Sequence, residues 1–318
     1  MENQPASDAT PDAILRRLEW TVIRRQDGVL QGDYRTLFRG AGLDLADLRE
    51  YQHHDDVRHI DWNVTARLQQ PYVREFTEDR ELTAWFLLDL SGSVDFGSAR
   101  TKRSVSVEFV TVLSRLLTRH GNRVGAMLYG NTLDEMLPAR NGRTHVLHLL
   151  QRMLKHTTPK AKTQTQLQDL LLRAAPAIPR RSTVFVVSDF ISAPGWEKAL
   201  AQLSLRHEVL AVRLYDPLEM ALPDLGLINM QDAETGEQIL IDTHDPGFRA
   251  RFARAAEEQE TALRDGLARA GVDTLELATD EDLLATLLRF VELRKQRVRM
   301  ASGNMPSHLK AEQPRRTA

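Results

Sequence analysis

Oxygen-bearing side chains gather at the end of one apolar segment. Trp85–Leu88 leads directly into Asp89, and Ser91 and Ser93 follow at alternate positions, with Gly92 between the two hydroxyls. This D-x-S-x-S spacing lets alternate side chains of one loop face a common point, and Gly92 lets the backbone turn between them. Mg²⁺ prefers oxygen ligands and keeps some of its waters, so a carboxylate with two hydroxyls suits it.

Two other loops offer further oxygen ligands. Thr163 and Thr165 stand just ahead of a helical pattern, QLQDLLLRAA, and Asp189 follows the apolar stretch STVFVVS. We expect both loops to lie near Asp89, because ligands of parallel sheets bind beyond the carboxyl ends of the strands. The sequence therefore predicts a divalent-metal site built from three separate loops.

The elements that would position these loops follow an alternating pattern from Leu82 to Arg299. Apolar segments such as RVGAMLY and HEVLAVRLYD are separated by segments with helical periodicity. Strands that are apolar on both faces and separated by helices indicate an α/β fold with a doubly wound, mostly parallel sheet covered on both sides. The sequence also predicts a hairpin turning at 234–236, a helix from Pro246 to Ala270, and a final helix opened by a capping box from Thr279 to Asp282.

The chain divides into four segments on these patterns. We predict that residues 1–11 and 300–318 are disordered, and that residues 12–81 hold an N-terminal helix and a small β-rich region. Residues 82–299 form the α/β domain.

Composition narrows the function. The chain has 318 residues and no cysteine, so thiol catalysis, thiolate metal sites and disulfides are excluded. Its formal net charge is -2, so the overall electrostatic field does not favour binding to nucleic acid. It contains no apolar run of about 18 residues and no secretory leader pattern, so we expect no membrane span and a cytoplasmic location. A P-loop motif is also missing from the sequence.

The order of these residues resembles the metal-ion-dependent adhesion site of von Willebrand factor type A domains. Carried over by position, the metal residues are Asp89, Ser91, Ser93, Thr165 and Asp189. The resemblance implies that Mg²⁺, or Mn²⁺ or Ca²⁺ in its place, is bound directly by the serines and through water by the aspartates. It also implies that a partner protein supplies an acidic residue to the last coordination position. The sequence has S-D-F where extracellular members have T-D-G.

A second polar cluster, DDVRHIDW, lies upstream. We assign a structural role to five of its residues, Asp55, Asp56, Arg58, Asp61 and Trp62. We interpret it as an ion-pair and hydrogen-bond cluster in which Arg58 bridges carboxylates and Trp62 packs on the core. A histidine/carboxylate metal site is the alternative reading, although the spacing matches no familiar ligand pattern.

Together with GAGLDLADLREY and VREF, this motif makes the chain similar to the bacterial family known as domain of unknown function 58, from about Phe38 to Leu293. His54 departs from the usual glycine. The resemblance implies a non-enzymatic accessory protein that works beside an AAA+ ATPase of the MoxR type to assemble or activate other protein complexes.

Four other readings remain. Asp89 to Ser93 could simply cap the next helix. A metal-dependent hydrolase could use the same cation to activate water, although no general base can be assigned. A serine nucleophile lacks an assignable base and oxyanion hole. His145 and His148 have the i, i+3 spacing of a zinc site, but an exposed helix face explains them better.

Overall fold

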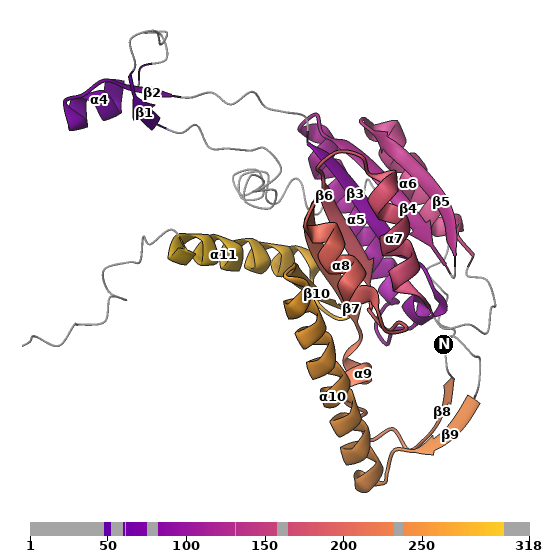
Figure 1. Ribbon diagram of the computed structural model, residues 1–318. Helices are drawn as coiled ribbons and strands as arrows, with labels where there is room; N and C mark the ends of the chain where they lie inside the picture. Colours follow the sequence, from indigo (N-terminus) through magenta and orange to yellow (C-terminus); the bar gives the residue numbers. More distant parts are fainter. Residues whose placement is uncertain are drawn as a thin grey trace, which may run out of the picture.

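A six-stranded sheet forms the centre of the computed structural model, which describes residues 48–51, 60, 62–74, 82–130, 132–157, 165–231 and 238–301. In sheet order its strands are β10 (Asp273–Ala278), β7 (Glu208–Tyr215), β6 (Thr183–Ser188), β3 (Thr83–Asp89), β4 (Arg123–Tyr129) and β5 (Leu133–Arg140) (Figure 1). All neighbours are parallel except β5, which is antiparallel to β4. The predicted doubly wound, mostly parallel α/β fold is confirmed.

Alternate side chains of β3 enter two separate cores because successive residues of a strand point to opposite faces of a sheet. Phe86 belongs to one core, where its ring stacks on Phe185 of β6 with centroids 5.1 Å apart. Trp85 belongs to the other core and packs closely over Gly125 of β4, where an added Cβ would lie 2.8 Å from the indole ring. Both faces of the sheet are therefore buried.

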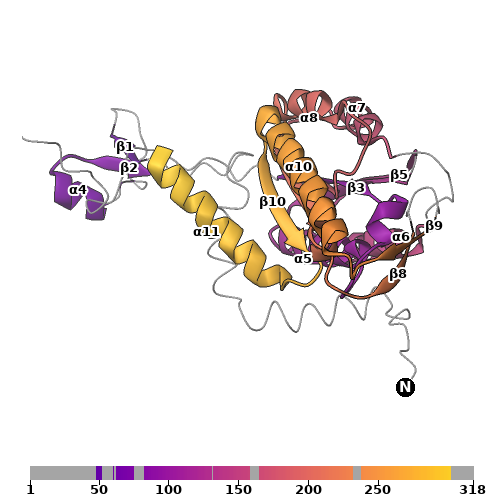
Figure 2. The same cartoon turned by 90° about the horizontal axis from the view of Figure 1, so that it is seen from below.

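Helices cover both faces of the sheet (Figure 2). One face packs against α5 (Lys102–Arg119), α6 (Arg143–Lys155) and α11 (Leu283–Ala301). The other face packs against α7 (Leu167–Ala177), α8 (Trp196–Ser204) and α10 (Pro246–Ala270). The bounds of α10 confirm the helix predicted over 246–270. Among the described residues, none of these helices offers an apolar stretch long enough to cross a membrane.

The predicted capping box at Thr279 is wrong. The Thr279 hydroxyl instead donates to Asp216 Oδ2 at 2.5 Å, and α11 begins only at Leu283, where the amide of Ala285 donates to Asp282 Oδ1 at 2.8 Å. The side chain of Thr279 is thus used to join β10 to the end of β7, and Asp282 alone caps the helix.

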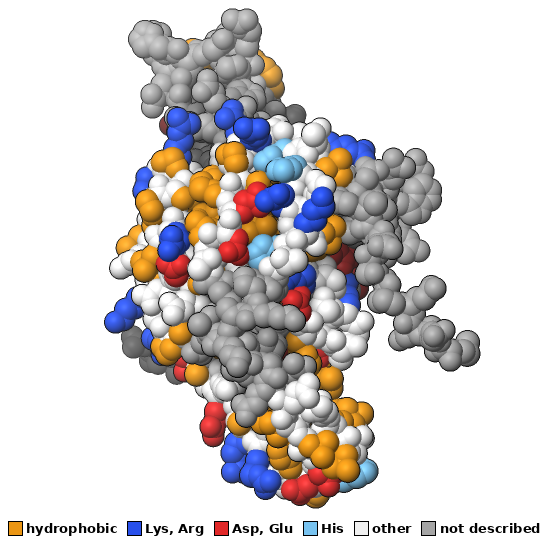
Figure 3. All heavy atoms as spheres, turned by 90° about the vertical axis from the view of Figure 1, so that its right-hand side faces the viewer, with side chains coloured by type: hydrophobic (Ala, Val, Ile, Leu, Met, Phe, Trp, Pro, Cys, Tyr) orange, Lys and Arg blue, Asp and Glu red, His pale blue; other side chains and the backbone are white. Residues whose placement is uncertain are grey.

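A hairpin projects between β7 and α10. Its strands β8 (Leu227–Gln231) and β9 (Gln238–Asp242) are antiparallel, as predicted, and residues 234–236 lie outside the described residues. The hairpin follows the short helix α9 (Pro217–Met220). Figure 3 shows hydrophobic side chains at this end of the molecule, where Leu227 and Leu240 are each 69% exposed.

The edge strand β5 contains Pro138, and its register against β4 shifts between Val124 and Ala126 and again between Leu128 and Tyr129. Exposed residues alternate along it with partly or fully buried ones, in contrast to the fully buried β6.

The described part of the N-terminal region is mixed rather than purely extended. It contains two short antiparallel strands, β1 (Leu48–Glu50) and β2 (Tyr72–Arg74), and a helix, α4 (Trp62–Leu68). Trp62 is 69% exposed, so the expectation that it packs on the core is wrong. At the other end α11 continues to Ala301, which places the first two residues of the predicted disordered tail in a helix. The predicted helix near residues 12–25 lies outside the described residues.

Candidate functional site

Two carboxylates meet at the carboxyl ends of neighbouring strands. Asp89 is the last residue of β3, and Asp189 directly follows β6. Because β3 and β6 are adjacent and parallel, both side chains reach the same edge of the sheet. Ser91 and Ser93 follow in the loop and in a 3-10 turn, η3 (Gly92–Asp95). All four side chains are buried.

The position of the Asp89 carboxylate is fixed by two donors. Its Oδ1 accepts from the amide of Ser91 at 3.0 Å, and its Oδ2 accepts from the hydroxyl of Ser188 at 2.6 Å. The Ser188 hydroxyl in turn accepts from the amide of Phe190 at 2.9 Å. Sequence reasoning missed Ser188, although its place one residue before Asp189 at a strand end was a usable signal.

The two loop hydroxyls lie side by side. Ser91 Oγ and Ser93 Oγ are 3.1 Å apart and hydrogen-bonded. Adjacent ligands of an octahedral Mg²⁺, each bound at about 2.1 Å, lie about 3.0 Å apart. The serine pair therefore has the spacing of two neighbouring ligands on one ion.

The pKa of Asp89 is raised to about 6, first by burial and second by the charge of Asp189, and hydrogen bonds from Ser188 and Ser91 limit the rise. The second of these causes is repulsion between two buried carboxylates at this edge of the sheet. A divalent cation would relieve that repulsion.

Lys102 supplies a positive charge that sequence reasoning missed. Its side chain is fully buried, and its Nζ donates to Asp189 Oδ2 at 2.7 Å and to Glu219 Oε1 at 2.6 Å. Burial lowers the pKa of Lys102, but the charges of Asp189 and Glu219 outweigh burial, so the net shift is upward and the side chain stays an ammonium. Nothing in the local sequence marks this lysine, because Glu219 lies 117 residues away along the chain.

Thr165 is fully buried just before α7. Its carbonyl oxygen accepts from the amide of Ala193 at 3.0 Å and from the hydroxyl of Ser192 at 2.9 Å, and both donors belong to the loop that starts at Asp189. The structure therefore joins the Thr165 and Asp189 loops directly. Thr163 and the motif residues Asp55, Asp56, Arg58 and Asp61 lie outside the described residues.

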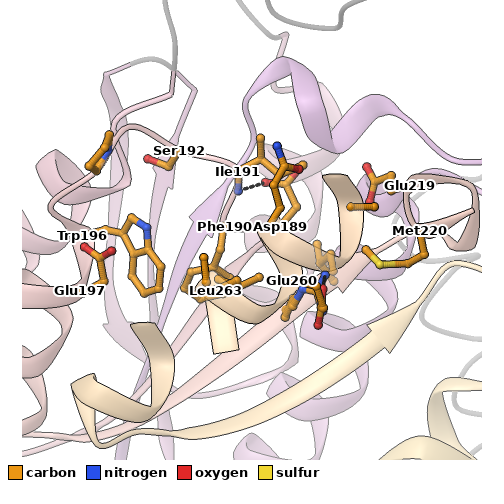
Figure 4. Close-up of a pocket in the computed structure, with 16 residues that line it drawn as sticks. Asp189, Phe190, Ile191, Ser192, Trp196, Glu197, Glu219, Met220, Glu260 and Leu263 are labelled. Atoms are coloured by element: carbon orange, nitrogen blue, oxygen red, sulfur yellow. Dashed lines mark hydrogen bonds and ion pairs between the residues drawn. The ribbon is translucent and has the colours of Figure 1, made fainter. Parts of the chain in front are cut away.

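A pocket of about 370 Å³ opens beside the carboxylates (Figure 4). Asp189 and Glu219 line one part of it, and Ile191, Trp196 and Leu263 supply apolar walls. In Figure 4 the Asp189 carboxylate accepts a hydrogen bond from the amide of Ile191, at 3.0 Å. Asp189 lines this pocket although its side chain is buried, and Asp89, Ser91, Ser93 and Thr165 are not among the lining residues.

The donor set fits a hard cation. Asp89, Asp189 and the serine hydroxyls offer oxygen only, which suits Mg²⁺ with part of its water shell retained. Within the described ranges, no group of three or more histidine, cysteine and acidic residues is placed to hold a metal. The Nε2–H of His145 donates to the carbonyl oxygen of Val124 at 2.7 Å, which gives this histidine a structural partner.

Comparison with known sequences places the chain in a family. Residues 47–262 match the family described as "Protein of unknown function DUF58". This chain belongs to the DUF58 family. The uncharacterized proteins Rv1480 of Mycobacterium tuberculosis H37Rv and Mb1516 of Mycobacterium bovis are each 37% identical to this DUF58 protein over 285 residues, which is 89% of this chain and 90% of theirs.

Solved structures with similar arrangements share little sequence with this DUF58 protein. An aerotolerance-related membrane protein from Bacteroides fragilis is 13% identical, with a TM-score of 0.43 and coverage of 68% of this chain and 99% of that one. The SpRpn10 VWA domain is 13% identical, with a TM-score of 0.36 and coverage of 66% and 94%.

Proposed function

We propose that this DUF58 protein is a non-enzymatic binding module that uses a divalent metal ion to capture an acidic residue of a partner protein. Asp89, Ser91, Ser93, Thr165 and Asp189 would hold the ion, and Mg²⁺ is the species that their oxygen ligands suit best.

The separation of the serine hydroxyls carries this proposal. Ser91 Oγ and Ser93 Oγ lie 3.1 Å apart, the spacing expected for two neighbouring ligands of one octahedral ion. Both oxygens of Asp89 already accept hydrogen bonds, which supports a contact with the ion through a bridging water. Neutral hydroxyls leave the ion's charge only partly balanced, so an external carboxylate remains attracted to it.

The partner that we propose is a MoxR-type AAA+ ATPase, together with a protein ligand that supplies the carboxylate. This assignment rests on the resemblance between the DDVRHIDW motif followed by D-x-S-x-S and the corresponding family pattern. The joint role would be assembly or activation of other protein complexes, in the cytoplasm and without contact to nucleic acid.

Capture of the host's MoxR-type ATPase by the full-length protein tests this function. We expect capture in Mg²⁺ and its loss in EDTA, and loss in Mg²⁺ for Asp89→Asn. Asp265→Asn is the matched control, because Asp265 is exposed on α10 and does not line the pocket beside Asp189. Equal capture by all three proteins with and without metal would contradict the proposal, and metal-dependent turnover of phosphate or ester substrates would favour the hydrolase reading instead.

A further inference from the structure

Lys102 is a fully buried cation beside the candidate metal site. It is the first residue of α5, and its ammonium bridges Asp189 Oδ2 at 2.7 Å and Glu219 Oε1 at 2.6 Å. A buried ammonium is stable only when it is paired and hydrogen-bonded, and here two carboxylates from separate parts of the chain satisfy it. The ring of Phe96 lies 6.0 Å from the same nitrogen.

The two carboxylates that share Lys102 belong to different parts of the sheet edge. Asp189 follows β6, whereas Glu219 lies in α9 after β7 and also accepts from the amide of Asp216 through Oε2, at 3.0 Å. Asp189 and Glu219 both line the pocket of Figure 4. A cation arriving at Asp189 therefore meets a carboxylate whose charge is already shared with a resident ammonium.

We infer that Lys102 is a positioning residue that sets the divalent-ion affinity of the site, with Glu219 drawing part of its charge away from Asp189. The inference rests on the proposed metal-dependent function. Lys102 neutralises and orients Asp189 in the absence of the ion, and its positive charge opposes the ion when the ion binds. Glu219 offsets this opposition, because its carboxylate shares the ammonium with Asp189.

This arrangement predicts opposite effects for two substitutions that each remove one charge. Lys102→Met keeps an unbranched side chain of similar length but removes the ammonium, so Mg²⁺ should bind about 10- to 100-fold more tightly. Glu219→Gln leaves Asp189 as the only charged partner of Lys102, so Mg²⁺ should bind about 5- to 50-fold more weakly. A residue with a merely structural role would weaken binding in both variants.

Calorimetric titration of the full-length protein with MgCl₂ measures both effects. Lys198→Met is the matched control, because Lys198 is exposed on α8 and should leave the affinity unchanged. Thermal unfolding in EDTA provides a second readout: Lys102→Met should unfold at a lower temperature than wild type and gain more from saturating Mg²⁺. If Lys102→Met does not fold, the weaker binding by Glu219→Gln decides the question alone.

The outcomes separate this inference from the proposed function. Unchanged or weaker Mg²⁺ binding by Lys102→Met, or unchanged binding by Glu219→Gln, overturns the role of Lys102 while leaving the metal site intact. Failure of every protein to bind Mg²⁺, Lys102→Met included, overturns both. Loss of partner capture with the predicted affinities preserved would overturn only the proposed function.

Discussion

The hydroxyl of Ser188 donates to Oδ2 of Asp89 across 2.6 Å and joins the ends of β6 and β3. The same hydroxyl oxygen accepts from the amide of Phe190, which turns the chain past Asp189. One small side chain thus fixes the position of one candidate metal residue and the backbone beside the other.

Ser188→Ala removes this link. We expect the free energy of unfolding to fall by about 1–3 kcal/mol, because a buried carboxylate loses a donor that nothing replaces. Urea denaturation at pH 7 in EDTA measures the change. Ser104→Ala is the control, since Ser104 is exposed and its hydroxyl donates to the local carbonyl of Thr101, and its effect should stay within about 0.5 kcal/mol. Equal effects of the two substitutions would show that the Ser188 hydroxyl is dispensable.

The pKa of Asp89 predicts a pH dependence of stability. Burial first, and Asp189 second, raise it from 3.8 to about 6, so between these values the folded protein binds more protons than the unfolded chain. Stability should therefore fall as pH rises through this window, by about 3 kcal/mol in all, and level off above pH 6.

Urea denaturation of wild type and Asp89→Asn in EDTA, from pH 4.5 to pH 7.5, isolates this contribution. The difference between the two proteins should shift in favour of Asp89→Asn as pH rises, because the amide does not titrate. When EDTA is replaced by saturating Mg²⁺, the loss of stability at higher pH should be offset in wild type but not in Asp89→Asn. A difference that stays constant with pH would falsify the raised pKa.

Metal binding should be visible as thermal stabilisation. A ligand that binds only the folded state at about 100 times its dissociation constant stabilises by about 2.7 kcal/mol, and EDTA should reverse the gain. The double variant Ser91→Ala, Ser93→Ala should lose most of the Mg²⁺-induced rise in Tm, measured by scanning calorimetry. Ser104→Ala should keep it, and KCl at matched ionic strength should not reproduce it. A Tm that rises equally in the double variant would assign the effect to salt rather than to the site.

The aromatic stack in the core should matter for stability independently of metal. Phe185→Ala removes a ring that stacks on Phe86 and meets Phe109 edge-on, which should cost about 3–5 kcal/mol. Guanidinium denaturation should show a lower midpoint, whereas Leu205→Ala should leave it nearly unchanged because Leu205 is 88% exposed. Similar midpoints for the two variants would mean that the core closes around the cavity.

The sequence predicted those features that depend on the order of neighbouring residues. Apolar segments separated by helical periodicity predicted the sheet and both helical layers, and the order of Asp89 and Asp189 at two strand ends predicted that they meet. What it could not supply were contacts between residues far apart in the chain. Lys102 looks like an ordinary charged residue at a helix start, and only folding brings it between Asp189 and Glu219.

Thr279 shows the same limit from the opposite direction. Its local context matches a helix cap, but a buried acceptor 63 residues away, on Asp216, takes its hydroxyl. The hydroxyl makes this tertiary hydrogen bond instead of capping α11, because its acceptor is the buried carboxylate at the N-terminus of α9.

Pro138 in β5 has a consequence for the behaviour of the protein in concentrated solution. An open sheet edge presents unpaired N–H and C=O groups that can pair with a strand of another molecule. Proline has no N–H to donate, and the register shifts of β5 make the edge irregular. Pro138 therefore disfavours chain-to-chain growth of the sheet at this edge, and replacement of Pro138 by a β-branched residue should make the protein more prone to aggregate.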